Sequence, residues 1–146
     1  GLLATSAEEL SIEDAKNNLE NQHQYQANVK KLRAASLLRN QLQMASCRNG
    51  LGIIYANQNR LSDAELELVA AGKIRKQIMS SNDPEFLTGL SHLSLVYFKQ
   101  NKLSKAEAIS KLILAANVET KGIEDEDTIR AKRNLELIQA EIKKQA

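Results

Sequence analysis

The stretch NRLSDAELELVAAGKIRKQ, residues Asn59–Gln77, decides the fold because the chain repeats it as NKLSKAEAISKLILAAN, residues Asn101–Asn117. Both copies open with Asn, a basic residue, Leu and Ser, and both carry Ala-Glu at the same offset. A phrase repeated at a fixed distance is typical of stacked structural repeats. The echo therefore predicts a chain whose function depends on how its repeats stack.

The repeat has a period of 42 residues, the distance from Ala64 to Ala106. Other pairs at this distance are Leu51 and Leu93, Tyr55 and Tyr97, Gln58 and Gln100, Leu61 and Leu103, and Leu93 and Leu135. Towards the N-terminus a shift of 36 aligns residues 32–42 with residues 68–78. Three copies and a partial fourth thus cover nearly the whole chain.

Each copy is predicted to form two antiparallel helices, so the fold class is all-α, a solenoid of helix pairs with no strand. The expected domain is a single one over residues 1–146. Its seven helices are expected at about 7–20, 24–43, 44–58, 62–80, 84–100, 104–119 and 126–144. They form pairs at about 7–43, 44–80 and 84–119, followed by a capping helix at about 126–144. Nothing between Arg39 and Asn49 breaks a helix, so the boundary at residue 43 is the weakest.

Local signals mark several helix starts. Ser62 with Glu65, Ser104 with Glu107 and Ser6 with Glu9 have the spacing of a capping box. Asp83 followed by Pro84 predicts a capped start with proline in the first turn, and the acidic run of residues 124–127 replaces it in the last copy. An apolar stripe is expected to be buried on the first helix of copy two: Met44, Cys47, Leu51, Ile54 and Tyr55. A second apolar set is expected to cover the preceding pair from the last helix: Ile129, Leu135, Ile138 and Ile142.

The composition excludes several classes of protein. The net charge of +2 does not favour nucleic acid, and no apolar run reaches the length of a membrane span. Cys47 is the single cysteine, so the chain can form no internal disulfide. The start of the chain leaves two locations open: cytoplasmic, or secreted or periplasmic if residues 2–7 are the remnant of a signal peptide.

The sequence shows no catalytic, metal-binding or cofactor-binding constellation. His23 and His92 are far apart and lack partners at ligand spacing, and no glycine-rich phosphate loop is present. The basic tracts Lys30–Arg33 and Lys73–Lys76 lack interleaved aromatic residues and are expected to be solvated faces. We therefore expect no enzyme activity and no cofactor.

The run Leu51-Gly52-x-x-Tyr55 followed by Ala64 resembles the pattern of the tetratricopeptide repeat, and Leu93, Tyr97 and Ala106 keep most of it. The 42-residue period is similar to that of the longer, kinesin-light-chain-like subtype. The resemblance implies a right-handed superhelix of helix pairs. It is weakest in copy one, where Lys16 stands at the position of Gly52 and Leu19 at that of Tyr55.

The resemblance also implies a protein-binding adaptor or scaffold that holds a peptide or partner helix in its concave groove. The groove residues that it implies are Asn49, Ile53, Asn57, Ser91, Leu95, Phe98, Lys99, Arg130, Arg133 and Leu137. Ile53 occupies a position where chaperone-binding members carry a clamp Asn, so capture of a carboxylate tail by that clamp is not expected. The alternative is a structural or regulatory fragment that self-associates, with a homodimer as its simplest form.

Overall fold

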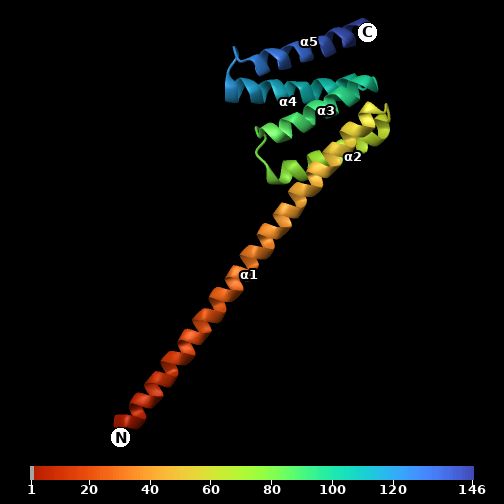
Figure 1. The fold of residues 1–146 in the computed structure, drawn as a ribbon. Helices are drawn as coiled ribbons and strands as arrows, with labels where there is room; N and C mark the ends of the chain where they lie inside the picture. The colour runs from red at the N-terminus through yellow and green to blue at the C-terminus, as the bar shows by residue number, and fades with distance from the viewer. Residues whose placement is uncertain (1) are drawn as a thin grey trace. The chain divides into compact units, whose positions relative to one another are not determined.

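The computed structural model describes the backbone of residues 2–146 and the side chains of residues 11–146, and every regular element in this range is an α-helix. The helices are α1 (Leu2–Asn57), α2 (Leu61–Ile78), α3 (Pro84–Lys99), α4 (Leu103–Lys121) and α5 (Glu126–Gln145) (Figure 1). The chain divides into two units, residues 1–40 and residues 41–146, and α1 enters both. None of the helices in the described residues is long and apolar enough to cross a membrane.

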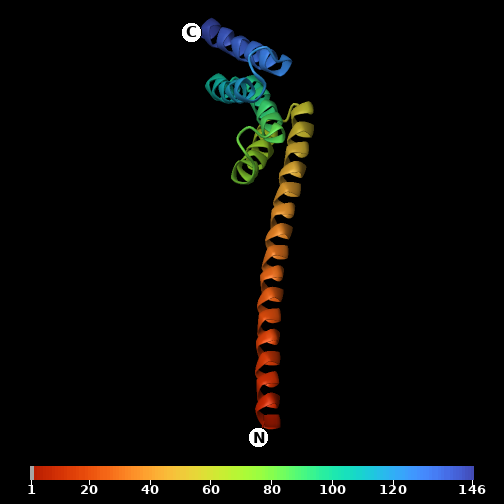
Figure 2. The same ribbon diagram turned by 90° about the vertical axis from the view of Figure 1, so that its left-hand side faces the viewer.

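In the second unit, the helices pack in chain order, each against the next one along the chain. The contacts join α2 to α3, α3 to α4 and α4 to α5, and Figures 1 and 2 show these four helices as successive rows. One apolar core joins them, formed by Ala64, Leu68, Leu93, Val96, Tyr97, Ala106 and Ile138. This arrangement is consistent with the predicted solenoid of helix pairs, although residues 2–146 form five helices and not about seven.

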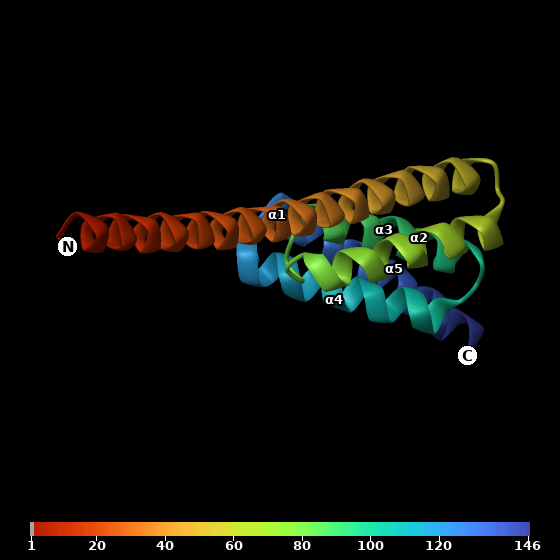
Figure 3. The same ribbon diagram turned by 90° about the horizontal axis from the view of Figure 1, so that it is seen from below.

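Small residues allow the paired helices to approach closely, as the repeat pattern predicts. The C-terminal part of α1 runs beside α2 (Figure 3), and a Cβ atom added at Gly52 would lie only 2.6 Å from Leu68 Cγ. In the next pair Ser94 replaces this glycine, and its hydroxyl donates a hydrogen bond of 3.2 Å to the carbonyl oxygen of Ala106. Ala64 and Ala106 are both fully buried.

The first residue of the doubled phrase forms the turn between the paired helices. Asn59 and Asn101 both have φ of 61°, a left-handed conformation that Asn adopts more readily than most residues. The amide of Arg60 donates to the Tyr55 carbonyl at 2.8 Å, and the amide of Asn59 donates to the Ala56 carbonyl at 3.0 Å. This is the Schellman pattern that ends a helix, and residues 97–102 repeat it.

The predicted capping boxes are wrong, whereas the predicted aspartate caps are confirmed. Helices α2 and α4 begin one residue before Ser62 and Ser104, and no side chain caps either start. Ser6 and Glu9 lie inside α1, among the residues whose side chains the structure does not describe. By contrast, Asp83 accepts a hydrogen bond of 2.9 Å from the amide of Glu85, and Asp125 caps α5 in the same way.

Helix α1 is continuous over the range predicted to hold the first three helices, so the helix ends expected near residues 20 and 43 are wrong. At the 36-residue shift, copy one has His23 at the position of the left-handed Asn59 and Lys16 at that of the close-packed Gly52. Asn28 likewise stands at the position of the fully buried Ala64. Copy one therefore lacks both the turn residue and the small interface residues that hold the other pairs together.

Three predictions of burial or exposure are also corrected. Most of the predicted stripe on α1 is exposed, namely Met44, Cys47, Leu51 and Ile54, and of that set only Tyr55 packs against the core. Conversely, Arg75, expected on a solvated face, is only 4% exposed and forms an ion pair of 3.4 Å with Glu85. On α5, Leu135 and Ile138 are buried and Ile142 packs on the core as expected, but Ile129 is exposed.

Glu65 links successive helix pairs by accepting hydrogen bonds from Lys102 Nζ at 2.8 Å and Gln100 Nε2 at 3.2 Å. The Lys102 hydrogen bond is the main reason that the pKa of Glu65 is held below its ordinary value of 4.5. Because the folded-state pKa is depressed, this stabilisation is present above pH 4.5 and is lost as the pH falls through the folded-state pKa.

Glu65→Gln is therefore expected to lower the free energy of unfolding at pH 7 by about 0.5–1 kcal/mol, the range of a partly exposed ion pair. The loss should shrink as the pH is lowered from 7 towards 3, because protonation of the wild-type carboxylate removes the charge that Lys102 contacts. Urea denaturation at the two pH values measures both quantities, with the exposed Glu136→Gln as control. Equal destabilisation at pH 3 and pH 7 would show that the charge of Glu65 contributes nothing.

Candidate binding groove

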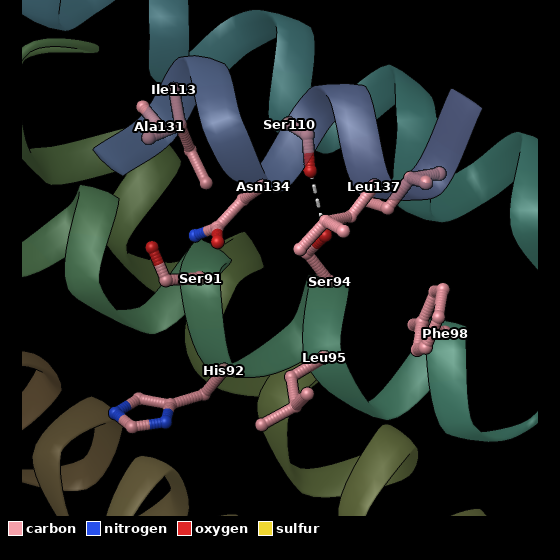
Figure 4. A pocket seen from close by; sticks show the side chains of 11 residues that line it. Ser91, His92, Ser94, Leu95, Phe98, Ser110, Ile113, Ala131, Asn134 and Leu137 are labelled. Atoms are coloured by element: carbon pink, nitrogen blue, oxygen red, sulfur yellow. Dashed lines mark hydrogen bonds between the residues drawn. The ribbon is translucent and has the colours of Figure 1, made fainter. Parts of the chain in front are cut away.

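A cleft of about 370 Å³ lies between α3 and α5, and α4 contributes to its wall. Figure 4 shows Ser91, Ser94, Leu95 and Phe98 on α3 with Asn134 and Leu137 of α5 across from them. The full lining is Ser91, His92, Ser94, Leu95, Phe98, Ser110, Ile113, Ala131, Asn134, Leu137 and Ile138. Because α3 and α5 follow equivalent turns of the repeat, this cleft separates two first helices of successive copies.

One end of the cleft is apolar and accessible to a ligand. Leu95, Leu137 and Phe98 are 51%, 62% and 36% exposed. The wall beneath them is fixed by a buried hydrogen bond of 3.0 Å between the hydroxyls of Ser94 and Ser110. Exposed apolar side chains around a concave surface are the usual anchors for a bound segment.

The cleft continues into a second, polar cavity of about 480 Å³ beside the N-terminal ends of α3 and α5. The two cavities share Ser91, Ile113, Ala131 and Asn134, so they form one continuous surface. The lining that only the polar end contains is Asn82, Pro84, Leu87, Thr88, Asn117, Thr120, Lys121, Asp127 and Arg130. We call the two cavities together the α3–α5 groove.

Charges at the polar end are largely paired with each other. Lys121 bonds to Asp127, which holds the pKa of Asp127 below and that of Lys121 above its ordinary value. Arg130 also pairs with Asp127, at 3.2 Å. Lys99 and Arg133 are exposed and form no ion pair with the residues that the structure describes. The three charged side chains that line the polar end, Lys121, Arg130 and Asp127, therefore sum to +1.

The predicted groove residues fall into two groups. Five line the α3–α5 groove, namely Ser91, Leu95, Phe98, Leu137 and Arg130. The other five line neither cavity of the groove: Asn49, Ile53, Asn57, Lys99 and Arg133. Among them, Asn49 lies against α3, with its Oδ1 atom 3.2 Å from the position of a Cβ on Gly89, and this oxygen has no hydrogen-bond partner. Ile53 is half-buried, and the remaining three are exposed.

The residue-level prediction missed His92 and Asn134, which both line the cleft. These two residues are 42 apart, so they occupy the same position of the repeat, one residue after Ser91 and Arg133. The repeat period could have paired them, but it does not say which of two adjacent helix positions faces the neighbour. The described residues contain no cluster of three or more His, Cys, Asp or Glu that could hold a metal ion.

Comparison with known proteins places the repeat in a family. A family model described as "Tetratricopeptide repeat" matches residues 44–85, a span as long as the 42-residue period. No curated protein matches the chain. The matched span includes the last residues of α1 and all of α2, which pack through Gly52, Ala64 and Leu68, and it ends at the start of α3. Residues 44–85 therefore form a tetratricopeptide repeat of the kinesin-light-chain-like type.

Proposed function

We propose that the α3–α5 groove binds a segment of a partner protein without catalysis. Tetratricopeptide repeats are protein–protein interaction modules, and the observation that supports this groove is its continuous lining with an apolar end and a polar end. Leu95, Phe98 and Leu137 would anchor apolar side chains of the partner, and the polar end would fix its direction.

The partner segment that fits best carries apolar residues next to acidic ones. Lys99 and Arg133 are exposed cations without ion pairs among the described residues, and they flank the apolar end in sequence. Acidic side chains on the partner would raise the rate of association and select its orientation. Lys99 and Arg133 are thus proposed as contacts at the rim of the groove.

Selection of peptides from a random displayed library against the full chain tests this function. The selected peptides should combine apolar and acidic residues, and Leu95→Glu or Leu137→Glu should weaken their binding by about 10- to 100-fold, as for central apolar anchors. Because both leucines are exposed, these variants should stay folded. Leu112→Glu is the matched control, since Leu112 on α4 is as exposed as Leu137 but lies outside the groove. Equal binding by Leu95→Glu and Leu112→Glu would rule the groove out.

We also propose that the chain self-associates, because a second apolar surface lies elsewhere in the same unit. Met44, Leu51 and Ile54 project from α1 as large exposed side chains, and none of them lines the α3–α5 groove. A homodimer would cover such a surface.

A further inference from the structure

The exposed stripe of α1, defined as Met44, Cys47, Leu51 and Ile54, has an exact counterpart elsewhere in the fold. At the 42-residue period these residues correspond to Phe86, Gly89, Leu93 and Val96 of α3. Leu93 and Val96 are buried in the core together with Leu68 of α2, and α2 packs on α3. The α2–α3 contact therefore shows what kind of helix would cover the stripe.

The residues that would form such a helix are present in the chain. At the 36-residue shift, Leu32, Ala35 and Arg39 correspond to Leu68, Ala71 and Arg75 of α2, all three of which are buried. Leu32, by contrast, is 68% exposed, and Ala35 and Arg39 are exposed as well. The chain thus exposes both halves of an interface that it buries one repeat later.

Copy one lacks the loop that would connect the two halves as a helix pair within one chain. The last residue of α2, Ile78, corresponds to Leu42 at the 36-residue shift, and the first residue of α3, Pro84, corresponds to the same Leu42 at the 42-residue shift. Copy one therefore lacks the counterpart of the six residues Met79–Pro84, which hold the turn from α2 to α3. Helix α1 runs from Leu2 to Asn57 without a turn between residues 24–42 and residues 44–57.

We propose that a second copy of this chain supplies the missing helix by a reciprocal exchange, in which residues 24–42 of each chain cover the exposed stripe of the other. This proposal rests on the proposed self-association and names its interface. Shortened connections between packed helices are known to favour exchange of an element between protomers. The contact is a repeat-to-repeat contact of the kind already present between α2 and α3.

The α2–α3 contact also sets the register of the exchanged pair. Arg75 Nη1 lies 2.9 Å from the position of a Cβ on Gly89, so these two positions face each other. Their counterparts are Arg39 of one chain and Cys47 of the other. Gln43 is midway between residues 39 and 47, so the two α1 helices would cross antiparallel at Gln43, on a twofold axis. In the same register Leu32 faces Ile54, which pairs the exposed apolar side chains of the two halves.

Light scattering on the full chain from about 1 to 100 µM tests the exchange, because a dimer forms according to protomer concentration. The wild type should reach twice the 16.2 kDa mass of the chain. Leu32→Glu and Ile54→Glu should each remain at the mass of one chain, since both place a charge in the interface. Both side chains are exposed within one chain, so circular dichroism should show unchanged helix content. Leu112→Glu, at a similarly exposed leucine of α4, should stay dimeric.

A loop insertion tests the cause of the exchange. Placing the sequence of Met79–Pro84 after Leu42 would let residues 24–42 fold back onto the stripe of their own chain, so this variant should be monomeric at every concentration. A monomeric wild type would overturn both self-association and exchange. A dimeric wild type that Leu32→Glu does not dissociate, or an insertion variant that stays dimeric, would overturn the exchange alone.

Discussion

Replacing Leu68 with alanine is expected to lower the free energy of unfolding of residues 41–146 by about 2–5 kcal/mol. Leu68 is 3% exposed and belongs to the core cluster that joins α2 to α3. It also lies directly against Gly52, so it packs on the helices before and after it. Truncation removes buried apolar surface and leaves a cavity that two neighbouring helices would have to close together.

Urea denaturation followed by tyrosine fluorescence measures this loss, in a Tyr25→Phe background that restricts the signal to Tyr55 and Tyr97 at the core. Leu66→Ala is the matched control, because Leu66 lies two residues earlier on α2 and is 67% exposed. The control should change the free energy by no more than about 0.5 kcal/mol. Similar losses in the free energy of unfolding for Leu68→Ala and Leu66→Ala would mean that burial of Leu68 does not stabilise the fold.

The repeated phrase predicted the second unit well because the geometry of the fold requires particular residues at several of its positions. Asn59 and Asn101 adopt the left-handed turn, and Ala64 and Ala106 are the fully buried residues of each close contact. Such positions tolerate few residue types, so the same letters recur wherever the same geometry recurs. No such geometric requirement explains the serines of the phrase, because Ser62 and Ser104 do not cap their helices as predicted.

The first unit was predicted poorly because helical periodicity persists when a turn is lost. Residues 24–42 keep the apolar spacing of α2, but the turn that would end this helix has no counterpart in the sequence. The spacing of apolar residues indicates which face of a helix is suited to packing, whereas the connection decides whether the neighbour can reach it. The missing turn is visible in the sequence as the difference between the two repeat shifts, 36 and 42, which equals the six residues Met79–Pro84.

The groove was predicted in part for a related reason. The repeat period correctly aligned Leu95 with Leu137, which lie at one end of the cleft. It placed Arg133 in line with Ser91, but the structure brings the neighbouring Asn134 to the groove instead, together with the predicted Arg130. Successive side chains of an α-helix point about 100° apart around its axis. A rotation of α5 about its own axis therefore decides which of two adjacent residues faces α3. Such a rotation depends on packing and has no sequence signature.

Gly52→Ala is the second substitution expected to have a large effect, and it should destabilise the fold by about 1–2 kcal/mol. The new Cβ would lie 2.6 Å from Leu68 Cγ and 2.8 Å from its Cδ2, and 3.3 Å from the carbonyl oxygen of Ala64. Overpacking of this kind costs about 1–3 kcal/mol, while the better helix propensity of alanine returns up to about 1 kcal/mol. The cost of overpacking exceeds the gain in helix propensity because Leu68 is buried and has little room to move.

Gly50→Ala separates the two effects, because nothing lies within 4 Å of a Cβ at Gly50. In the same helix it should raise the free energy of unfolding by up to about 1 kcal/mol. The double variant Gly52→Ala with Leu68→Ala removes the clashing Cγ and Cδ2 atoms, so its loss should be smaller than the sum of the single losses by about 1–3 kcal/mol. Additive losses would show that the close approach of α1 and α2 does not explain this glycine. A non-additive result would tie Gly52 to the same contact that makes Leu68 indispensable.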